Sequence, residues 1–266
     1  MDRRFLIYIS FLSILSAFSM GKSHTRPGVA AADRLAARTC EADVILWKTV
    51  EARYDDMIAC KGGDKLLELD SFCKGLSVKF RQTDHPLLSK AELLKVVEWK
   101  FGKGKPRWAL LGHLNSNGDD AVKKASSDAF EKSCLGNISG AIKSLCELKG
   151  VGPATASAIL SIHREDLFAF MDDEVIECLY DGKRGYTLKI YLDVNSQCAK
   201  LANILGSKEW SPRRVGRALW AAARVCAEGG EDLTLEDCRA SSSKAKTRKN
   251  APPTTIKRSS KRLKSK

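Results

Sequence analysis

The sequence predicts an all-α protein, and three observations support this. Apolar residues recur at helical spacing over much of the 266-residue chain. No alternating pattern typical of a strand persists for more than a few residues. Two stretches also begin with strong helix-start signals: Ser89 with Glu92 forms a capping box, and Ser211 precedes Pro212. We therefore expect about ten helices, and 44% apolar composition is enough for one or two compact lobes.

The helices can be placed in order along the chain. The first, over residues 41–60, carries apolar groups on one face, and Trp47 and Tyr54 share that face because they are seven residues apart. A basic turn over residues 101–108 separates the helix that follows Ser89 from the next one. The expected helical stretches are 41–60, one or two short helices within 64–82, one from 90, then 108–115, 119–133, 138–147, one from 153, one through 175–179, 186–206 and 211–228.

The segment Gly150-Val151-Gly152 interrupts two of these helices and predicts an anion site. Two glycines permit positive φ and close approach of another backbone, and Pro153 suits the first position of a helix. The free N–H groups of such a turn and the positive end of the second helix attract a phosphate, directly or through a bound monovalent cation. An ordinary tight turn between helices is the alternative. The candidate DNA-phosphate-binding residues are Leu148, Gly150, Val151, Gly152, Ala154 and Thr155.

Asp172 lies twenty residues beyond Gly152 and is a candidate catalytic residue. A carboxylate fixed below a deoxyribose stabilises the positive charge that develops when an N-glycosidic bond breaks, and it can orient or deprotonate the attacking water. The alternative is helix capping, because Asp172 or Asp173 suits the start of a helix that continues through Val175 and Ile176. The two roles are compatible.

The run Leu148-Lys-Gly-Val-Gly-Pro-Ala-Thr-Ala, followed by Phe170–Val175, resembles the helix-hairpin-helix DNA glycosylases of the endonuclease III type. The resemblance covers residues 138–180 in motif and 40–230 in architecture. It implies a helix-hairpin-helix glycosylase-like bundle that binds duplex DNA. It also implies that Asp172 is the catalytic aspartate, with Asp173 one residue away as the alternative register. Ala154 stands where the bifunctional members carry a lysine, so the resemblance implies a monofunctional enzyme of base-excision repair, which hydrolyses the bond to a damaged or mispaired base without a lyase step.

The chain also departs from the family pattern. Asp173 and Glu174 replace a Thr-His pair, and neighbouring carboxylates raise one another's pKa. This departure favours an alternative function, a DNA-binding module that has lost the chemistry. The candidates for a pocket around an extruded base are Trp47, Tyr54 and Trp99, with Trp108, Trp210 and Trp220 as further aromatic candidates and an ordinary core position as the alternative for each.

Cofactors and metals are not expected. The C-terminal third carries Cys198, Cys226 and Cys238, too few and too far apart for the iron–sulfur cluster of some family members. The nine cysteines include no Cys-x-x-Cys, and only four histidines are present, so we expect no zinc site. Cys146, Cys178 and Cys226 fall on apolar faces of expected helices and should be buried thiols. Unpaired spacing of the cysteines favours a reducing compartment.

The net charge of +13 is concentrated at the ends of the chain. Residues 239–266 hold eleven Lys and Arg and no acid, whereas residues 27–238 are close to neutral. We expect the tail over 239–266 to be disordered and to serve as a nuclear-import signal or a non-specific DNA arm. Within the folded part, three local basic patches are expected, each with an ordinary solvated surface as the alternative: Lys100, Lys103, Lys105 and Arg107; Arg213, Arg214 and Arg217; and the pair Lys183 and Arg184.

Residues 1–20 have the charged start, apolar run and small residues of a secretory signal, and the run is too short for an ordinary membrane span. A true signal, an organelle-targeting segment and an erroneous upstream extension of the gene model are the alternatives. We expect a helical domain over 40–230, a monomer, no membrane association of the mature protein and nuclear localisation, with secretion or an organelle as the alternative. A secreted helical protein is the third functional hypothesis.

Overall fold

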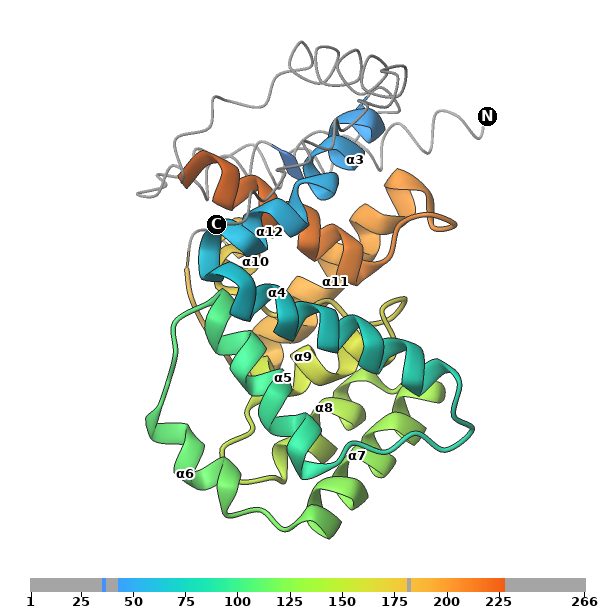
Figure 1. Ribbon diagram of the computed structural model, residues 1–266. Helices are drawn as coiled ribbons and strands as arrows, with labels where there is room; N and C mark the ends of the chain where they lie inside the picture. The colour runs from blue at the N-terminus through green and yellow to red at the C-terminus, as the bar shows by residue number, and fades with distance from the viewer. Residues whose placement is uncertain (1–34, 37–42, 181–182, 228–266) are drawn as a thin grey trace, which may run out of the picture. The chain divides into compact units, whose positions relative to one another are not determined.

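The computed structural model describes residues 35–36, 43–180 and 183–227, and the regular elements within these ranges are helices (Figure 1). No strand occurs among these residues, so the all-α prediction is confirmed for the part of the chain that is described. The predicted signal-like segment over 1–20 and the predicted basic tail over 239–266 lie outside the described residues.

The first predicted helix, over 41–60, is in fact two. Helix α3 (Val44–Ala52) ends just before Arg53, and α4 (Tyr54–Arg81) begins just after it. Helix α4 absorbs the short helices expected within 64–82 and is kinked at Gly63, where φ is +60°. Trp47 on α3 packs edge-on against Trp210, and Tyr54 on α4 packs against Trp220.

The next three helices follow the predicted pattern closely. Helix α5 (Lys90–Lys103) begins at the predicted capping box, in which the Ser89 side chain accepts from the Glu92 N–H and the Glu92 carboxylate accepts from the Ser89 N–H. Helix α6 (Ala109–Asn115) and helix α7 (Asp119–Cys134) follow. The basic turn expected over 101–108 is shorter than predicted, because α5 continues to Lys103.

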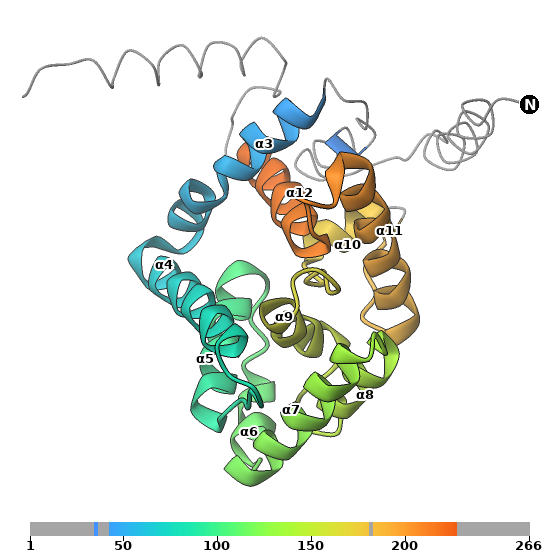
Figure 2. The ribbon, with the colours of Figure 1, turned by 90° about the vertical axis from the view of Figure 1, so that its right-hand side faces the viewer.

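Helix α8 (Ile138–Cys146) and helix α9 (Pro153–His163) form the predicted hairpin. Every residue of α9 from Thr155 to His163 is buried, which suits its small and aliphatic side chains. The helix contacts α4, α5, α7, α8 and α11, and Figure 2 shows it inside a ring of these helices. The core around α9 therefore fixes the position of the hairpin turn at its N-terminus.

Three further helices complete the described part of the chain: α10 (Asp173–Leu179), α11 (Leu188–Gly206) and α12 (Pro212–Ala227). Helix α12 contacts α3, α4, α10 and α11. Within the described ranges, no helix is long and apolar enough to cross a membrane.

His163, at the end of α9, is a buried titratable residue without a hydrogen-bond partner at either ring nitrogen. Its ring stacks on Phe130 at 3.9 Å between centroids and meets Phe80 edge-on. Burial lowers the pKa of His163 to about 4, from an ordinary value of 6.5. The unfolded chain therefore takes up a proton between about pH 6.5 and 4 that the folded chain does not accept.

We accordingly expect His163 to destabilise the protein as the pH falls through this window, because protonation favours the unfolded state. His163→Phe keeps the aromatic packing and removes the titration. Urea denaturation at a series of pH values should show that the variant gains a few kcal/mol relative to the wild type between pH 6.5 and 4, because a tenfold change in proton affinity corresponds to about 1.4 kcal/mol. A constant difference between the two proteins would contradict this assignment.

Candidate functional site

The hairpin turn has the backbone that the sequence predicts. Gly150 has φ of +79°, and a Cβ there would lie 3.1 Å from Leu114 Cγ and 3.2 Å from both His113 Cβ and the Leu110 carbonyl oxygen. Gly150 is therefore required both by its φ and by the close approach of α6. Gly152 differs, because its φ of −109° is ordinary and a Cβ there would meet nothing within 4 Å.

The Asn117 side chain ties this turn to the α6–α7 connection by hydrogen bonds. Asn117, in the α6–α7 connection, accepts a hydrogen bond from the Lys149 N–H at 3.0 Å and donates to the Lys149 carbonyl at 2.9 Å. Its amide also donates to the Leu114 carbonyl at 3.0 Å. Asn117 is buried, and its role could not be read from the sequence because it lies 32 residues from the turn that it holds.

The N-terminus of α9 opens into a pocket of ≈ 570 Å³, which we call the hairpin pocket. Gly152 is the N-cap residue and provides no side-chain cap. Among the described residues, the N–H groups of Gly152 and Ala154 donate to no acceptor, while the Gly152 carbonyl accepts from Thr155 and Ala156. The pocket is lined by Lys100, Gly104, Lys105, Pro106, Arg107, Leu110, Gly150, Gly152, Pro153, Ala154, Thr155, Phe170, Met171, Asp173, Arg184 and Tyr186.

The structure thus brings four of the six predicted phosphate-binding residues to one pocket: Gly150, Gly152, Ala154 and Thr155. The other two, Leu148 and Val151, are buried at 5% and 6% exposure and are not part of the pocket wall. Their side chains anchor the turn in the core and leave its backbone to meet a ligand.

Basic side chains surround the pocket. Lys105 and Arg107 are exposed, and Lys100 stands on the wall beside them. Burial lowers the pKa of Lys100, an effect that Asp172 opposes. Arg184, the fourth cation, is already engaged by Glu177 and by Asp173, the latter at 3.0 Å. Lys100, Lys105 and Arg107 are therefore the cations with charge to offer an anion.

Asp173 is the carboxylate on the pocket wall. It accepts a hydrogen bond from the Tyr186 hydroxyl at 2.7 Å and pairs with Arg184. Burial and this hydrogen bond raise the pKa of Tyr186 to about 12, so the phenol stays protonated as a donor. The Arg107 guanidinium lies 4.8 Å from the centre of the Tyr186 ring, which holds the basic loop against this wall.

Asp172 does not line the pocket. It occupies the N-cap position of α10, but its side chain makes no cap hydrogen bond. Its Oδ2 accepts from Lys103 Nζ at 2.6 Å, and the two residues are 5% and 2% exposed. Capping by the Asp172 side chain, the alternative raised by the sequence, is therefore wrong.

Lys103 is enclosed by aromatic rings, and we call this arrangement the lysine cage. Its Nζ lies 4.4 Å from the ring centre of Trp220, 5.1 Å from Tyr54, and 5.2 Å from both Trp99 and Phe170. Aromatic faces attract an ammonium group, most strongly where water is excluded. The four rings and the Asp172 carboxyl together therefore surround the Lys103 amino group.

A second carboxylate, that of Asp70, binds two of the cage residues by hydrogen bonds. Asp70 Oδ1 accepts from the Tyr54 hydroxyl at 3.0 Å and from Trp99 Nε1 at 2.9 Å, while Oδ2 pairs with Lys74 at 3.1 Å. Burial alone would raise the pKa of Asp70, but the charges of Lys74 and Lys103 and the Trp99 hydrogen bond lower it on balance. Asp70 is thus an ionised hydrogen-bond acceptor, and it holds the Tyr54 and Trp99 rings of the cage in place.

Burial raises the pKa of Asp172 to about 7, against the opposing effect of Lys103, and Glu174 adds to the rise. A carboxyl whose pKa is higher in the folded state favours folding at low pH. We expect this group to cost the protein stability as the pH rises from about 4 to 7, because a tenfold change in proton affinity corresponds to about 1.4 kcal/mol.

Asp172→Asn removes this titration. The difference in unfolding free energy between the variant and the wild type, measured by urea denaturation, should move in favour of the variant by a few kcal/mol between pH 4 and 7. Asp172→Asn also removes the charge partner of Lys103, which changes the absolute stability. The test is therefore how the difference in unfolding free energy changes with pH, not its value at one pH. Parallel curves would show that Asp172 does not titrate in this range.

The three predicted base-pocket residues are all buried and do not form one site. Tyr54 and Trp99 belong to the lysine cage, where they are joined by Trp220. Trp47 is fully buried against Trp210 and lies outside the cage. The expectation that Trp47 and Tyr54 share a helix face depended on one continuous helix over 41–60, and the structure instead places them on α3 and α4.

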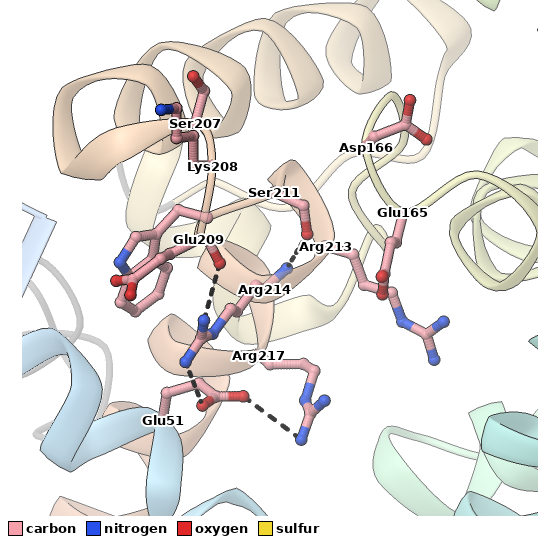
Figure 3. Close-up of a pocket in the computed structure, with 11 residues that line it drawn as sticks. Glu51, Glu165, Asp166, Ser207, Lys208, Glu209, Ser211, Arg213, Arg214 and Arg217 are labelled. Atoms are coloured by element: carbon pink, nitrogen blue, oxygen red, sulfur yellow. Dashed lines mark hydrogen bonds and ion pairs between the residues drawn. The ribbon is translucent and has the colours of Figure 1, made fainter.

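The second expected basic patch, at the start of α12, is engaged within the fold. Arg214 donates to the Glu209 carbonyl at 2.7 Å and pairs with Glu51, which also meets Arg217 at 3.5 Å (Figure 3). Arg213 donates to the Ser161 carbonyl at 3.0 Å. These arginines line a groove of ≈ 480 Å³, the α12 groove, together with the acidic residues Glu51, Glu165, Asp166 and Glu209. The matching acidic charge makes the groove a poor anion site.

Lys103 is the residue of the site that sequence reasoning placed wrongly. The basic patch assigned it to the surface with Lys100 and Arg107, but it is buried. A signal for burial was present, since Lys103 follows Val96 by seven residues and Trp99 by four and so lies on the apolar face of α5.

The thiols follow the expectation of burial only in part. Cys178 is buried as predicted, whereas Cys146 is half-buried, with a pKa raised by burial to about 11. The side chain of Cys226, the third thiol expected in the core, lies outside the described part of the chain. Cys198 is also buried, which raises its pKa to about 12. Within residues 35–36, 43–180 and 183–227, no three potential metal ligands cluster.

Comparison with known proteins gives no guide to the function, because no family model, curated protein or solved structure matches this chain. The function therefore has to be inferred from the residues and their geometry.

Proposed function

We propose that this protein binds duplex DNA through the hairpin pocket, as a helix-hairpin-helix module of the kind found in DNA glycosylases. The observation that carries the proposal is the uncapped N-terminus of α9, whose Gly152 and Ala154 N–H groups face a pocket with three available cations. A helix N-terminus with free N–H groups favours a phosphate, and neighbouring Lys and Arg add Coulomb attraction.

The charge of the pocket distinguishes this site from the rest of the folded chain. Residues 27–238 are nearly neutral overall, so the described surface does not attract DNA everywhere. Lys100, Lys105 and Arg107 lie in one short segment that covers the last turn of α5 and the residues just after it. Asn117 holds the hairpin turn in place through its hydrogen bond to the Lys149 carbonyl. A backbone N–H site with cations on one side suits a single strand of a duplex, whose phosphates follow one another along a line.

Removing the exposed cations should weaken binding and lower its salt dependence. We expect the double variant Lys105→Gln, Arg107→Gln to lose affinity for a labelled duplex, and the slope of log K against log salt to fall by about 0.9 for each lost phosphate contact. Fluorescence anisotropy with the full chain at several salt concentrations measures both quantities.

The double variant Lys61→Gln, Lys65→Gln is the matched control, because both lysines are exposed on α4, neither lines the hairpin pocket, and the total charge changes by the same amount. If the two double variants weaken binding equally, the hairpin pocket has no special role. If wild-type protein shows no duplex binding at low salt, nucleic acid is not its ligand.

Hydrolysis of an N-glycosidic bond is the second candidate function, and the position of Asp172 favours it. Asp172 is the N-cap residue of α10 and contacts Lys103, the centre of the lysine cage, and Phe170 belongs both to the cage and to the wall of the hairpin pocket. An extruded base would meet rings suited to stacking and a carboxylate suited to the sugar. Lys103 occupies the cage and neutralises Asp172, so catalysis requires that the Lys103 side chain move out of the cage and away from Asp172.

Binding to a duplex with a cationic pyrrolidine abasic analogue separates the two functions. A catalyst should bind this analogue of the charged transition state at least ~10²-fold more tightly than undamaged duplex, and Asp172→Asn should lose that preference. Equal affinity for both duplexes is the result expected of a binding module in which Lys103 has neutralised the carboxylate.

A further inference from the structure

Trp108 is exposed beside the hairpin pocket, and nothing in the proposed phosphate contact uses it. It is 63% exposed, whereas Trp47, Trp99, Trp210 and Trp220 are each at most 2% exposed. Its ring meets the buried Phe101 edge-on, with centroids 5.5 Å apart. This contact fixes the ring at one side and leaves an aromatic surface open to solvent.

The neighbours of Trp108 connect it with the pocket. It directly follows Arg107 and precedes Leu110 by two residues, and both of these line the hairpin pocket. It is also the residue from which α6 starts, and the Leu110 carbonyl of that helix packs against Gly150. The open ring is therefore held close to the same cations and the same turn that would hold the backbone of a nucleic acid.

We propose that Trp108 stacks on an unpaired nucleobase, so that the protein prefers DNA with an extrahelical or single-stranded base over a fully paired duplex. The proposal rests on the proposed function, because the phosphate contact at the hairpin pocket brings the base to the ring. An aromatic face binds any base by stacking, and cations beside it neutralise the adjoining phosphates. Among the described residues, the other large apolar side chains that are exposed, such as Leu135 at 78% exposure, carry no aromatic ring.

The test compares the affinity of the full chain for a labelled duplex and for the same duplex with a bulged thymine. Base stacking predicts that wild type prefers the bulged DNA by between about 5-fold and about 100-fold, and that Trp108→Ala abolishes the preference while its affinity for the paired duplex is unchanged. Trp108→Phe keeps a ring and should retain part of the preference. Leu135→Ala is the control for loss of an exposed apolar side chain.

Intrinsic fluorescence provides an independent readout, because the other four tryptophans are buried. Oligothymidine should quench the wild type, and neither Trp108→Ala nor Trp108→Phe should show this quenching. An equal bulge preference in wild type and Trp108→Ala, or no preference in wild type, would overturn the stacking proposal. Failure of the hairpin-pocket proposal looks different: binding of the paired duplex would be unaffected by loss of Lys105 and Arg107.

Discussion

Lys103→Met is expected to destabilise the folded protein by about 3–5 kcal/mol at pH 8, because it removes one partner of a buried ion pair and leaves Asp172 without its cation. Methionine is close to lysine in length and apolar, so the lysine cage stays filled and the loss is not one of volume. The Asp172 carboxyl then stays buried without the cation that it contacts in the wild type. Urea denaturation followed by tryptophan fluorescence measures the effect.

The dependence on pH identifies the cause. Lys103 lowers the pKa of Asp172, so its removal should raise that pKa further, and the buried carboxyl should then take up a proton. The destabilisation should shrink as the pH falls towards 5. Adding Asp172→Asn to Lys103→Met should recover stability at pH 8, because no charge is left buried. If the loss of unfolding free energy in the double variant equals the sum of the losses in the two single variants, Lys103 and Asp172 do not stabilise the fold through their ion pair.

Gly150→Ala is expected to cost roughly 2–5 kcal/mol of unfolding free energy, as the sum of two effects. A φ of +79° places an alanine in the left-handed region, which costs about 1–2 kcal/mol. The new Cβ would also lie 3.1 Å from Leu114 Cγ, and such overpacking costs about 1–3 kcal/mol. Denaturation at neutral pH measures the sum.

The neighbouring glycine is the matched control for this change. Gly152→Ala adds the same methyl group two residues away, at an ordinary φ and with free space around the Cβ. Its effect on stability should stay within about 0.5 kcal/mol, the range of surface substitutions. Equal destabilisation by the two variants would show that the Gly150 backbone is not strained in the way described.

The sequence predicted those parts of the fold that depend on local signals. The Ser89 capping box, the helix over 119–133 and the turn at Gly150 could all be predicted, because each follows from a few adjacent residues. The break at Arg53 could not be predicted, since the apolar pattern of the sequence continues across it. Long-range contacts decide such a case.

The candidate site was predictable to the same extent. Gly150, Gly152, Ala154 and Thr155 are adjacent in sequence and appear together in the hairpin pocket. The lysine cage joins Trp99 and Lys103, four residues apart on α5, to Tyr54 of α4 and Trp220 of α12, and no spacing along the chain relates the three helices. Asn117 was missed for the same reason, as its partner Lys149 is distant in sequence.

The most direct test of the central claim is the affinity of full-length Gly152→Ala for duplex DNA. A Cβ at Gly152 meets nothing within 4 Å, so we expect the fold to stay intact, and the added methyl group on this pocket-lining residue should hinder a phosphate that approaches the Gly152 and Ala154 N–H groups. A hydrogen bond to a charged group contributes about 1.5–3 kcal/mol, so we predict that the variant binds duplex roughly 10- to 100-fold more weakly than wild type with unchanged stability. Unchanged affinity in a stably folded Gly152→Ala protein would contradict a phosphate site at the hairpin.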